Sequence, residues 1–136
     1  MSTKIFINLP VKDLKRTKAF FAALGFSFNP QFTDEKAACL VVSEEIYAML
    51  ATEPLFKTFA GHKDICDAAK CAEALVALTV ESRAKVDEMA EKVIAAGGKE
   101  HRPAEDHGWM YGKSFEDPDG HIWEFFWMDP AHVQKS

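Results

Sequence analysis

The sequence predicts an α+β fold of two tandem β-α-β-β-β modules that form a curved mixed sheet around a trough. Each half of the chain starts with an apolar extended segment. A capped amphipathic helix that ends at glycine follows, and then three strand-like segments. Residues 9–13, with the pattern Leu-x-Val-x-Asp, also match residues 78–82, with the pattern Leu-x-Val-x-Ser. The shared order of elements, caps and glycine stops favours duplication of one module over chance similarity.

The first module is expected over about residues 4–52. Its opening apolar segment at 6–11 is followed by Asp13, a residue type that often caps helix N-termini. A helical pattern then covers 14–24 and ends at Gly25, which suits the conformation at a helix C-terminus. Three strand-like segments complete the module, at 26–32, 36–42 and 45–51.

The second module is expected over about residues 75–128 and repeats this order. Its first strand covers 75–80, and Ser82 takes the cap position that Asp13 has in the first module. The helix that follows places its apolar side chains on one stripe, formed by Val86, Met89, Ala90 and Val93. The helix ends at a Gly-Gly pair, and strand-like segments follow at 98–102, 109–116 and 121–128.

Residues 53–74 connect the two modules and form a long connector for a compact domain. The connector is open to three interpretations: a lid, a crossover or a contact with a partner. A chain of 136 residues, 48% of them hydrophobic, is long and apolar enough to form a core. We therefore expect a single domain over residues 1–136.

The composition argues against several classes of protein. A net charge of −5 disfavours a binder of nucleic acid or of anionic membranes, because both need a basic face. No apolar stretch is long enough to span a bilayer, and the N-terminus lacks the apolar core of a signal peptide. Cys39, Cys66 and Cys71 form an odd set without a CxxC pair, which is typical of reduced thiols in a cytoplasmic protein.

Glu124 is the most informative single residue, because it carries charge on a strand that is otherwise largely apolar. Alternation along the strand places Glu124 on the same face as Ile122, Phe126 and Met128. A carboxylate there needs a partner, a metal, a ligand or a raised pKa. Glu124 is therefore the candidate catalytic residue, as a general base on a ligand. Acceptance of a hydrogen bond from a ligand and a structural ion pair are the alternatives.

Side-chain alternation also predicts which residues line the trough and bind a substrate. The first module is expected to contribute Phe6, Asn8, Tyr47 and Met49, and the second to contribute Leu75, Ala77 and Phe126 beside Glu124. His107, Trp109 and Tyr111 are expected near the mouth of the trough. Aromatic and apolar side chains with a few polar groups are typical of a small-molecule pocket. The alternative is that the aromatic side chains only fill the core.

Three motifs carry a resemblance to a known family. They are Leu-Pro-Val-Lys-Asp-Leu at 9–14, Phe-Phe-Ala-Ala-Leu-Gly-Phe at 20–26, and Glu-Asp-Pro-Asp-Gly-His-Ile-Trp-Glu at 116–124. With the paired modules, these motifs make nearly the whole chain resemble the vicinal oxygen chelate superfamily. That superfamily includes lactoylglutathione lyase, bleomycin-resistance proteins, fosfomycin-modifying enzymes and extradiol dioxygenases. The resemblance implies the two-module fold and a homodimer.

Enzymes of that superfamily usually hold a divalent metal in the trough, with ligands from four strands. The resemblance places Glu124 at the last ligand position, but the other three positions fall at Phe6, Met49 and Leu75. Two of these side chains have no donor atom, and a thioether is a poor ligand for hard or borderline cations. We therefore expect no metal and no other cofactor. An alternative shell of Asn8 and Glu124 supplies few donors.

The sequence thus favours a metal-independent protein that binds a small apolar or aromatic molecule in its trough. The alternative is a metal-dependent lyase of the lactoylglutathione lyase type that uses Glu124. Whether the chain catalyses any reaction stays open at this point. A third interpretation is an assembly or regulatory module whose cavity is incidental.

Overall fold

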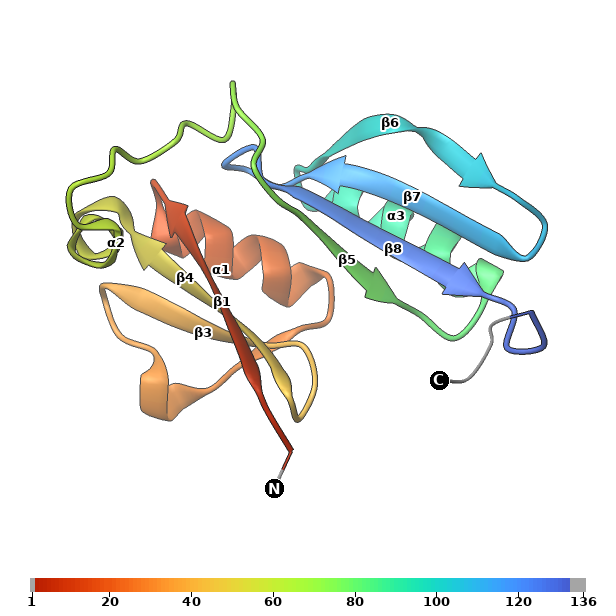
Figure 1. The fold of residues 1–136 in the computed structure, drawn as a ribbon, viewed down its shortest axis with the longest axis horizontal. Coiled ribbons are helices and arrows are strands. Elements are labelled where there is room, and N and C mark those ends of the chain that lie inside the picture. The colour runs from red at the N-terminus through yellow and green to blue at the C-terminus, as the bar shows by residue number, and fades with distance from the viewer. Residues whose placement is uncertain (1, 133–136) are drawn as a thin grey trace. The chain divides into compact units, whose positions relative to one another are not determined.

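Each half of the chain folds into a β-α-β-β-β module with a four-stranded mixed sheet, which confirms the predicted fold class (Figure 1). The structure is a computed structural model and describes residues 2–132. The chain divides into two compact units, Met1–Asp67 and Ala68–Ser136. Within the described residues, no helix is long and apolar enough to cross a membrane.

The first unit has strand order β1-β4-β3-β2, with β1 parallel to β4 and the other pairs antiparallel. Its elements are β1 (Ile5–Val11), α1 (Leu14–Ala23), β2 (Ser27–Phe28), the 3-10 helix η1 (Pro30–Phe32), β3 (Ala37–Val41), β4 (Ile46–Thr52) and α2 (Glu53–Ala60). The predicted cap is present, because the Asp13 side chain accepts a hydrogen bond from the Arg16 backbone N–H at the start of α1. Buried Leu14, Phe20 and Phe21 then pack α1 onto β3 and β4.

One prediction for the first unit is wrong, and one helix was not predicted. The strand expected over 26–32 has only the two residues of β2 and then turns into η1. Asn29 caps η1 by accepting the Gln31 N–H, and Pro30 has no N–H to give to a strand ladder. The connector also starts with a helix, α2, where no helix was predicted. This helix is short and begins without a side-chain cap bond, so the usual start signal is missing.

The second unit has strand order β5-β8-β7-β6, with β5 parallel to β8. Its elements are β5 (Leu75–Thr79), α3 (Arg83–Ala95), β6 (Lys99–Asp106), β7 (Met110–Glu116) and β8 (Ile122–Met128). Ser82 caps α3 by accepting the Lys85 N–H, as predicted. The stripe of Val86, Met89 and Val93 is buried, which packs α3 mainly onto β7 and β8.

Strand β6 is longer than the predicted segment at 98–102 and is irregular. It continues through Pro103 to Asp106, and its register with β7 shifts between Glu100 and Arg102 and again between Arg102 and Glu105. Because β6 is the edge strand of its sheet, a proline there does not break an inner ladder. The shifts leave part of β6 unpaired with β7. This irregularity changes which β6 side chains lie on each face of the sheet.

Candidate functional site

Four residues in register form a row across the sheet of the second unit. Arg102 on β6 pairs with Ser114 on β7, Ser114 pairs with Glu124 on β8, and Glu124 pairs with Ala77 on β5. The neighbours of Ser114 along β7 point toward α3, since Lys113 contacts the α3 residue Asp87. Strand alternation therefore places the row on the face opposite α3.

Glu124 is largely buried in this row, and its partner is Arg102. Its side chain is 16% exposed, and its Oε2 accepts a hydrogen bond from Arg102 Nη2 at 3.2 Å. Gly112 leaves room for the carboxylate, because a Cβ there would lie 3.3 Å from Glu124 Oε1. Among residues 2–132, no hydrogen bond to Oε1 is found, so one carboxylate oxygen remains available to a ligand.

The ion pair continues along β6 to His107. Arg102 Nη1 donates to Glu105 Oε1 at 2.7 Å, and Glu105 Oε2 lies 3.5 Å from His107 Nε2. The hydrogen bond from Arg102 lowers the pKa of Glu105 below its ordinary value. Two predicted site residues, Glu124 and His107, thus belong to one network that is joined by Arg102 and Glu105. Sequence reasoning missed these two joining residues, because Pro103 and the register shifts interrupt the alternation along β6.

Ser114, in the middle of the row, has a buried hydroxyl without a hydrogen-bond partner in the described structure. An unsatisfied buried polar group costs about 1–3 kcal/mol. We therefore expect Ser114→Ala to raise the free energy of unfolding by up to about 1 kcal/mol, as measured by urea denaturation.

Thr17→Val is the control for this substitution, because it also removes a buried hydroxyl. The Thr17 hydroxyl donates to the Asp13 carbonyl at 3.0 Å, so its loss should lower the free energy of unfolding by about 1 kcal/mol. A comparable loss for Ser114→Ala would show that the Ser114 hydroxyl has a partner in solution.

The four predicted residues of the first unit share one face of their sheet. Phe6 pairs with Tyr47 and Asn8 with Met49 across β1 and β4, and the Phe6 and Tyr47 rings stack with centroids 4.6 Å apart. This is the more exposed face, since Ala48, which points the other way, is buried, whereas Phe6 is 46% exposed. The face therefore carries an exposed Phe6 ring, stacked on the half-buried Tyr47, beside an amide.

Helix α2 adds aromatic side chains near Asn8. Asn8 lines a shallow hollow of about 410 Å³ together with Phe56, Phe59 and Ala60 of α2. The Asn8 side chain also donates to the Phe6 carbonyl at 3.2 Å. The sequence contained a signal for helix α2 and its apolar face. Phe56 and Ala60 are four residues apart, and a proline lies in the first turn.

The remaining predicted site residues lie in different places. Leu75 and Phe126 are on the Glu124 face, since they alternate in step with Ala77 and Glu124 on their strands. Trp109 lies just before β7 and stacks on His132, with centroids 4.4 Å apart.

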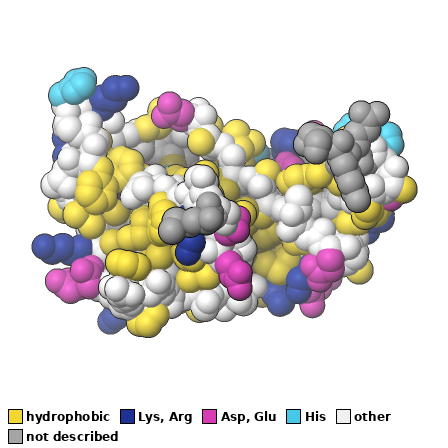
Figure 2. All heavy atoms as spheres, turned by 60° about the horizontal axis from the view of Figure 1, so that its bottom comes forward, with side chains coloured by type: hydrophobic (Ala, Val, Ile, Leu, Met, Phe, Trp, Pro, Cys, Tyr) yellow, Lys and Arg dark blue, Asp and Glu magenta, His cyan; other side chains and the backbone are white. Residues whose placement is uncertain are grey.

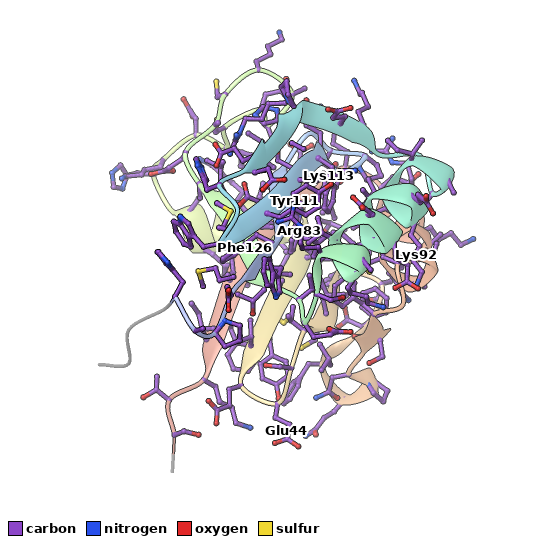
Figure 3. The ribbon with its side chains drawn as sticks, turned by 90° about the vertical axis from the view of Figure 1, so that its right-hand side faces the viewer. Glu44, Arg83, Lys92, Tyr111, Lys113 and Phe126 are labelled. Carbon is purple, nitrogen blue, oxygen red and sulfur yellow. The ribbon has the colours of Figure 1, made fainter. Side chains whose placement is uncertain are left out.

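Tyr111 points away from Glu124. It lies on the α3 side of the sheet, where its hydroxyl donates to Asp87 Oδ1 at 2.6 Å and the Arg83 guanidinium lies over its ring (Figure 3). The hydrogen bond to Asp87 raises the pKa of Tyr111. Tyr111 is therefore not a neighbour of Glu124. On β7 it lies an odd number of residues from Ser114, so its side chain is on the opposite face of the sheet from the Glu124 row.

The comparisons with known proteins agree with this fold. Similar solved structures include a hypothetical protein from S. aureus, with 28% identity and a TM-score of 0.76 over 93% of this chain and 94% of that one. A glyoxalase/bleomycin resistance protein/dioxygenase family enzyme from Burkholderia phytofirmans has 14% identity and a TM-score of 0.79 over 93% and 99%. The fosfomycin resistance protein FosX from Mesorhizobium loti has 15% identity and a TM-score of 0.70 over 96% of each chain. The comparison with curated proteins gives no match.

The fold is thus that of the vicinal oxygen chelate proteins, with two four-stranded β-α-β-β-β modules. A family model matches residues 5–125. The chain belongs to the Glyoxalase/Bleomycin resistance protein/Dioxygenase superfamily.

The four positions that the resemblance assigns to metal ligands, Phe6, Met49, Leu75 and Glu124, supply one carboxylate and one thioether. Phe6 and Leu75 have no donor atoms, and the Phe6 ring stacks on Tyr47. Glu124, at the remaining carboxylate position, already accepts a hydrogen bond from the cationic Arg102. Within residues 2–132, no three His, Cys, Asp or Glu side chains gather in a way that could hold a metal ion. A divalent cation needs several such donors in a defined geometry.

Proposed function

We propose that this chain binds a small, largely apolar or aromatic molecule on the sheet face that carries Glu124, without the family's divalent metal. The observation that carries the proposal is the largely buried Glu124 carboxylate, paired with the partly exposed Arg102, on a face that also holds Phe126 and Leu75. A carboxylate held largely away from water is costly unless its remaining hydrogen-bonding capacity is used. A ligand that covers the pair can use that capacity.

The chemistry of the pair defines the polar part of the ligand. Glu124 Oε1 accepts hydrogen bonds, so it selects a hydroxyl or amide N–H on the ligand. The side chains of Phe126 and Leu75 on the same face favour an aromatic or apolar body. The ligand is therefore an apolar or aromatic molecule with at least one hydrogen-bond donor.

Thermal-shift screening of small aromatic alcohols and amides tests the proposal. Compounds that raise the Tm of the unmodified protein should raise that of Glu124→Gln by a smaller amount, because the amide replaces a charged acceptor with a neutral one. Glu88→Gln is the matched control, since Glu88 pairs with Lys85 on the exposed surface of α3. Equal shifts for Glu124→Gln and the control would remove Glu124 from the binding site.

Metal analysis tests the proposal that the protein works without a divalent metal. Protein purified without chelator should contain divalent metal well below one ion per chain, because the donor set is too small. A stoichiometric divalent ion together with glyoxalase activity that EDTA abolishes would instead establish the metal-dependent lyase alternative.

We further propose a single-domain cytoplasmic protein that forms a homodimer. None of the three cysteines forms a disulfide, which agrees with a reducing compartment. Apolar side chains gather in patches on the surface (Figure 2), and Ile5, Phe32 and Phe59 are among the exposed ones. Such patches suit an interface between subunits. Light scattering during size-exclusion chromatography should give a mass of twice 15.2 kDa.

A further inference from the structure

A larger cavity lies in the second unit on the side of the sheet opposite Glu124. Its volume is about 840 Å³, and its walls come from α3, β6 and β7. Tyr111 and Lys113 point from β7 toward α3 at this cavity, as Figure 3 shows. The volume is within the range of small-molecule pockets, which is about 300–1,000 Å³. Of the Glu124 row, only Ser114 is among the residues that line it, and Glu124 itself is not.

The irregular edge strand explains why this space is open. Helix α3 packs mainly on β7 and β8, and the register shifts in β6 carry part of that strand out of the ladder. The lining includes Ala90 of α3 and Ala104 of β6, whose small side chains fill little of the space between the helix and the edge strand. Ile94 of α3 is left 56% exposed at the cavity wall. An exposed large apolar side chain at a concave surface marks unused apolar contact area.

The floor of the cavity is apolar and its rim is acidic. Phe115 and Phe125 line it, with their rings stacked at a centroid distance of 5.3 Å. The lining includes three acidic residues and one basic residue, so its net charge is negative. They are Asp87, Glu91, Glu100 and Lys113.

The acidic groups of the rim are not all neutralised within the protein. Lys113 Nζ lies 2.8 Å from Asp87 Oδ1 and lowers the pKa of that carboxyl group. The side-chain carboxylates of Glu91 on α3 and Glu100 on β6 have no ion-pair or hydrogen-bond partner within residues 2–132. Two uncompensated carboxylates therefore flank an apolar cavity from two different elements.

We propose that this cavity is a second ligand site, which takes a small organic amine with an aromatic or apolar body. The body packs on Phe115 and Phe125 and covers Ile94, while the ammonium group pairs with Glu91 and Glu100. Charge complementarity selects a cation over a neutral or anionic molecule of the same shape. The site is independent of the proposed function of the Glu124 face, because the two lie on opposite sides of one sheet.

Three probes of similar shape and different charge test this proposal by NMR titration of the ¹⁵N-labelled full chain. They are 2-phenylethylamine, 2-phenylethanol and 3-phenylpropionate. The amine should shift the amide signals of residues at the cavity, such as Ala90, Ile94 and Ala104, in a saturable way. The alcohol should bind about three- to tenfold more weakly, and the anion should bind more weakly still.

Two variants localise the site, with a control on the same helix. The double variant Glu91→Gln/Glu100→Gln should weaken amine binding about three- to tenfold and leave binding of the alcohol unchanged. Ala104→Phe, at an exposed position of the edge strand, should fill the cavity and weaken both probes while the protein stays folded. Glu88→Gln removes an acidic group outside the cavity and should change neither affinity.

Four outcomes would overturn the proposal. One is equal affinity for the three probes, and another is amine affinity that the double variant does not change. A third is amine-induced shifts confined to the Glu124 row, which would assign binding to the face of the proposed function instead. The fourth is no saturable binding up to about 10 mM amine, a concentration at which weak sites of a few kcal/mol are still detected.

Discussion

Replacing Asp117 with alanine is expected to lower the free energy of unfolding by about 3–5 kcal/mol. The Asp117 carboxylate is buried and accepts three hydrogen bonds. Two come from the backbone N–H groups of Asp119 and His121, and one comes from the indole Nε1–H of Trp123. Burial raises the pKa of Asp117, since the charged form is held away from water. Without the carboxylate, these donors lose their partner in the core.

Asp34→Ala is the matched control for this prediction. Asp34 also accepts two backbone N–H bonds, from Lys36 and Ala37, but it lies in an exposed turn. Water can replace it there, so we expect a loss of only about 1 kcal/mol. Urea denaturation followed by tryptophan fluorescence measures both values. A loss for Asp117→Ala no larger than that of the control would contradict the structural role given to Asp117.

The hydrogen bond between Asp117 and Trp123 also bears on the candidate site. Trp123 is the residue before Glu124, and it is buried on the α3 side of β8. Fixing the indole on that side fixes Glu124 on the other, because consecutive side chains of a strand point to opposite faces. The motif that resembles the family most closely therefore supplies both the candidate functional carboxylate and the anchor that orients its strand.

Replacing Gly120 with alanine is expected to lower the free energy of unfolding by about 2–4 kcal/mol. Gly120 has φ of +94°, a conformation that side chains with a Cβ rarely adopt. A Cβ at this position would also lie 2.8 Å from the Ala68 carbonyl oxygen and 2.8 Å from the Ala69 nitrogen. Both are backbone atoms, so the turn or the connector has to move.

Gly108→Ala separates the cost of the positive φ from the cost of the close backbone contact. Gly108 has φ of +81°, but a Cβ there would meet no atom within 4 Å. We therefore expect only the conformational cost, about 1–2 kcal/mol. Thermal and urea unfolding of both variants give the comparison, and equal losses would mean that the contact between Gly120 and residues 68–69 does not form in solution.

Much of the fold could be predicted because its signals are local. Asp13 and Ser82 cap their helices as expected, and the buried stripe of α3 follows helical periodicity. The predictions failed where a local signal was missing or ambiguous. Apolar residues at 26–32 resembled a strand until Pro30 ended the ladder, and α2 begins without a cap bond.

The candidate site could be predicted only in part. Strand alternation is a local rule, and it identified the face that holds Glu124 together with Phe126. It identified neither Arg102 nor the orientation of Tyr111. Arg102 reaches Glu124 across 22 residues of sequence and through an irregular strand, so no spacing in the chain predicts this contact.

Residue order thus established the repeated module, its caps and turns, and the presence of a charge on an apolar strand. These depend on backbone preferences and on periodicity, which act over a few residues. The tertiary structure decided which cation meets that charge, which hydroxyl stays without a partner, and where a cavity remains beside α3. Those features depend on strand register and on how side chains from distant segments fill space, and neither quantity is a property of any short segment.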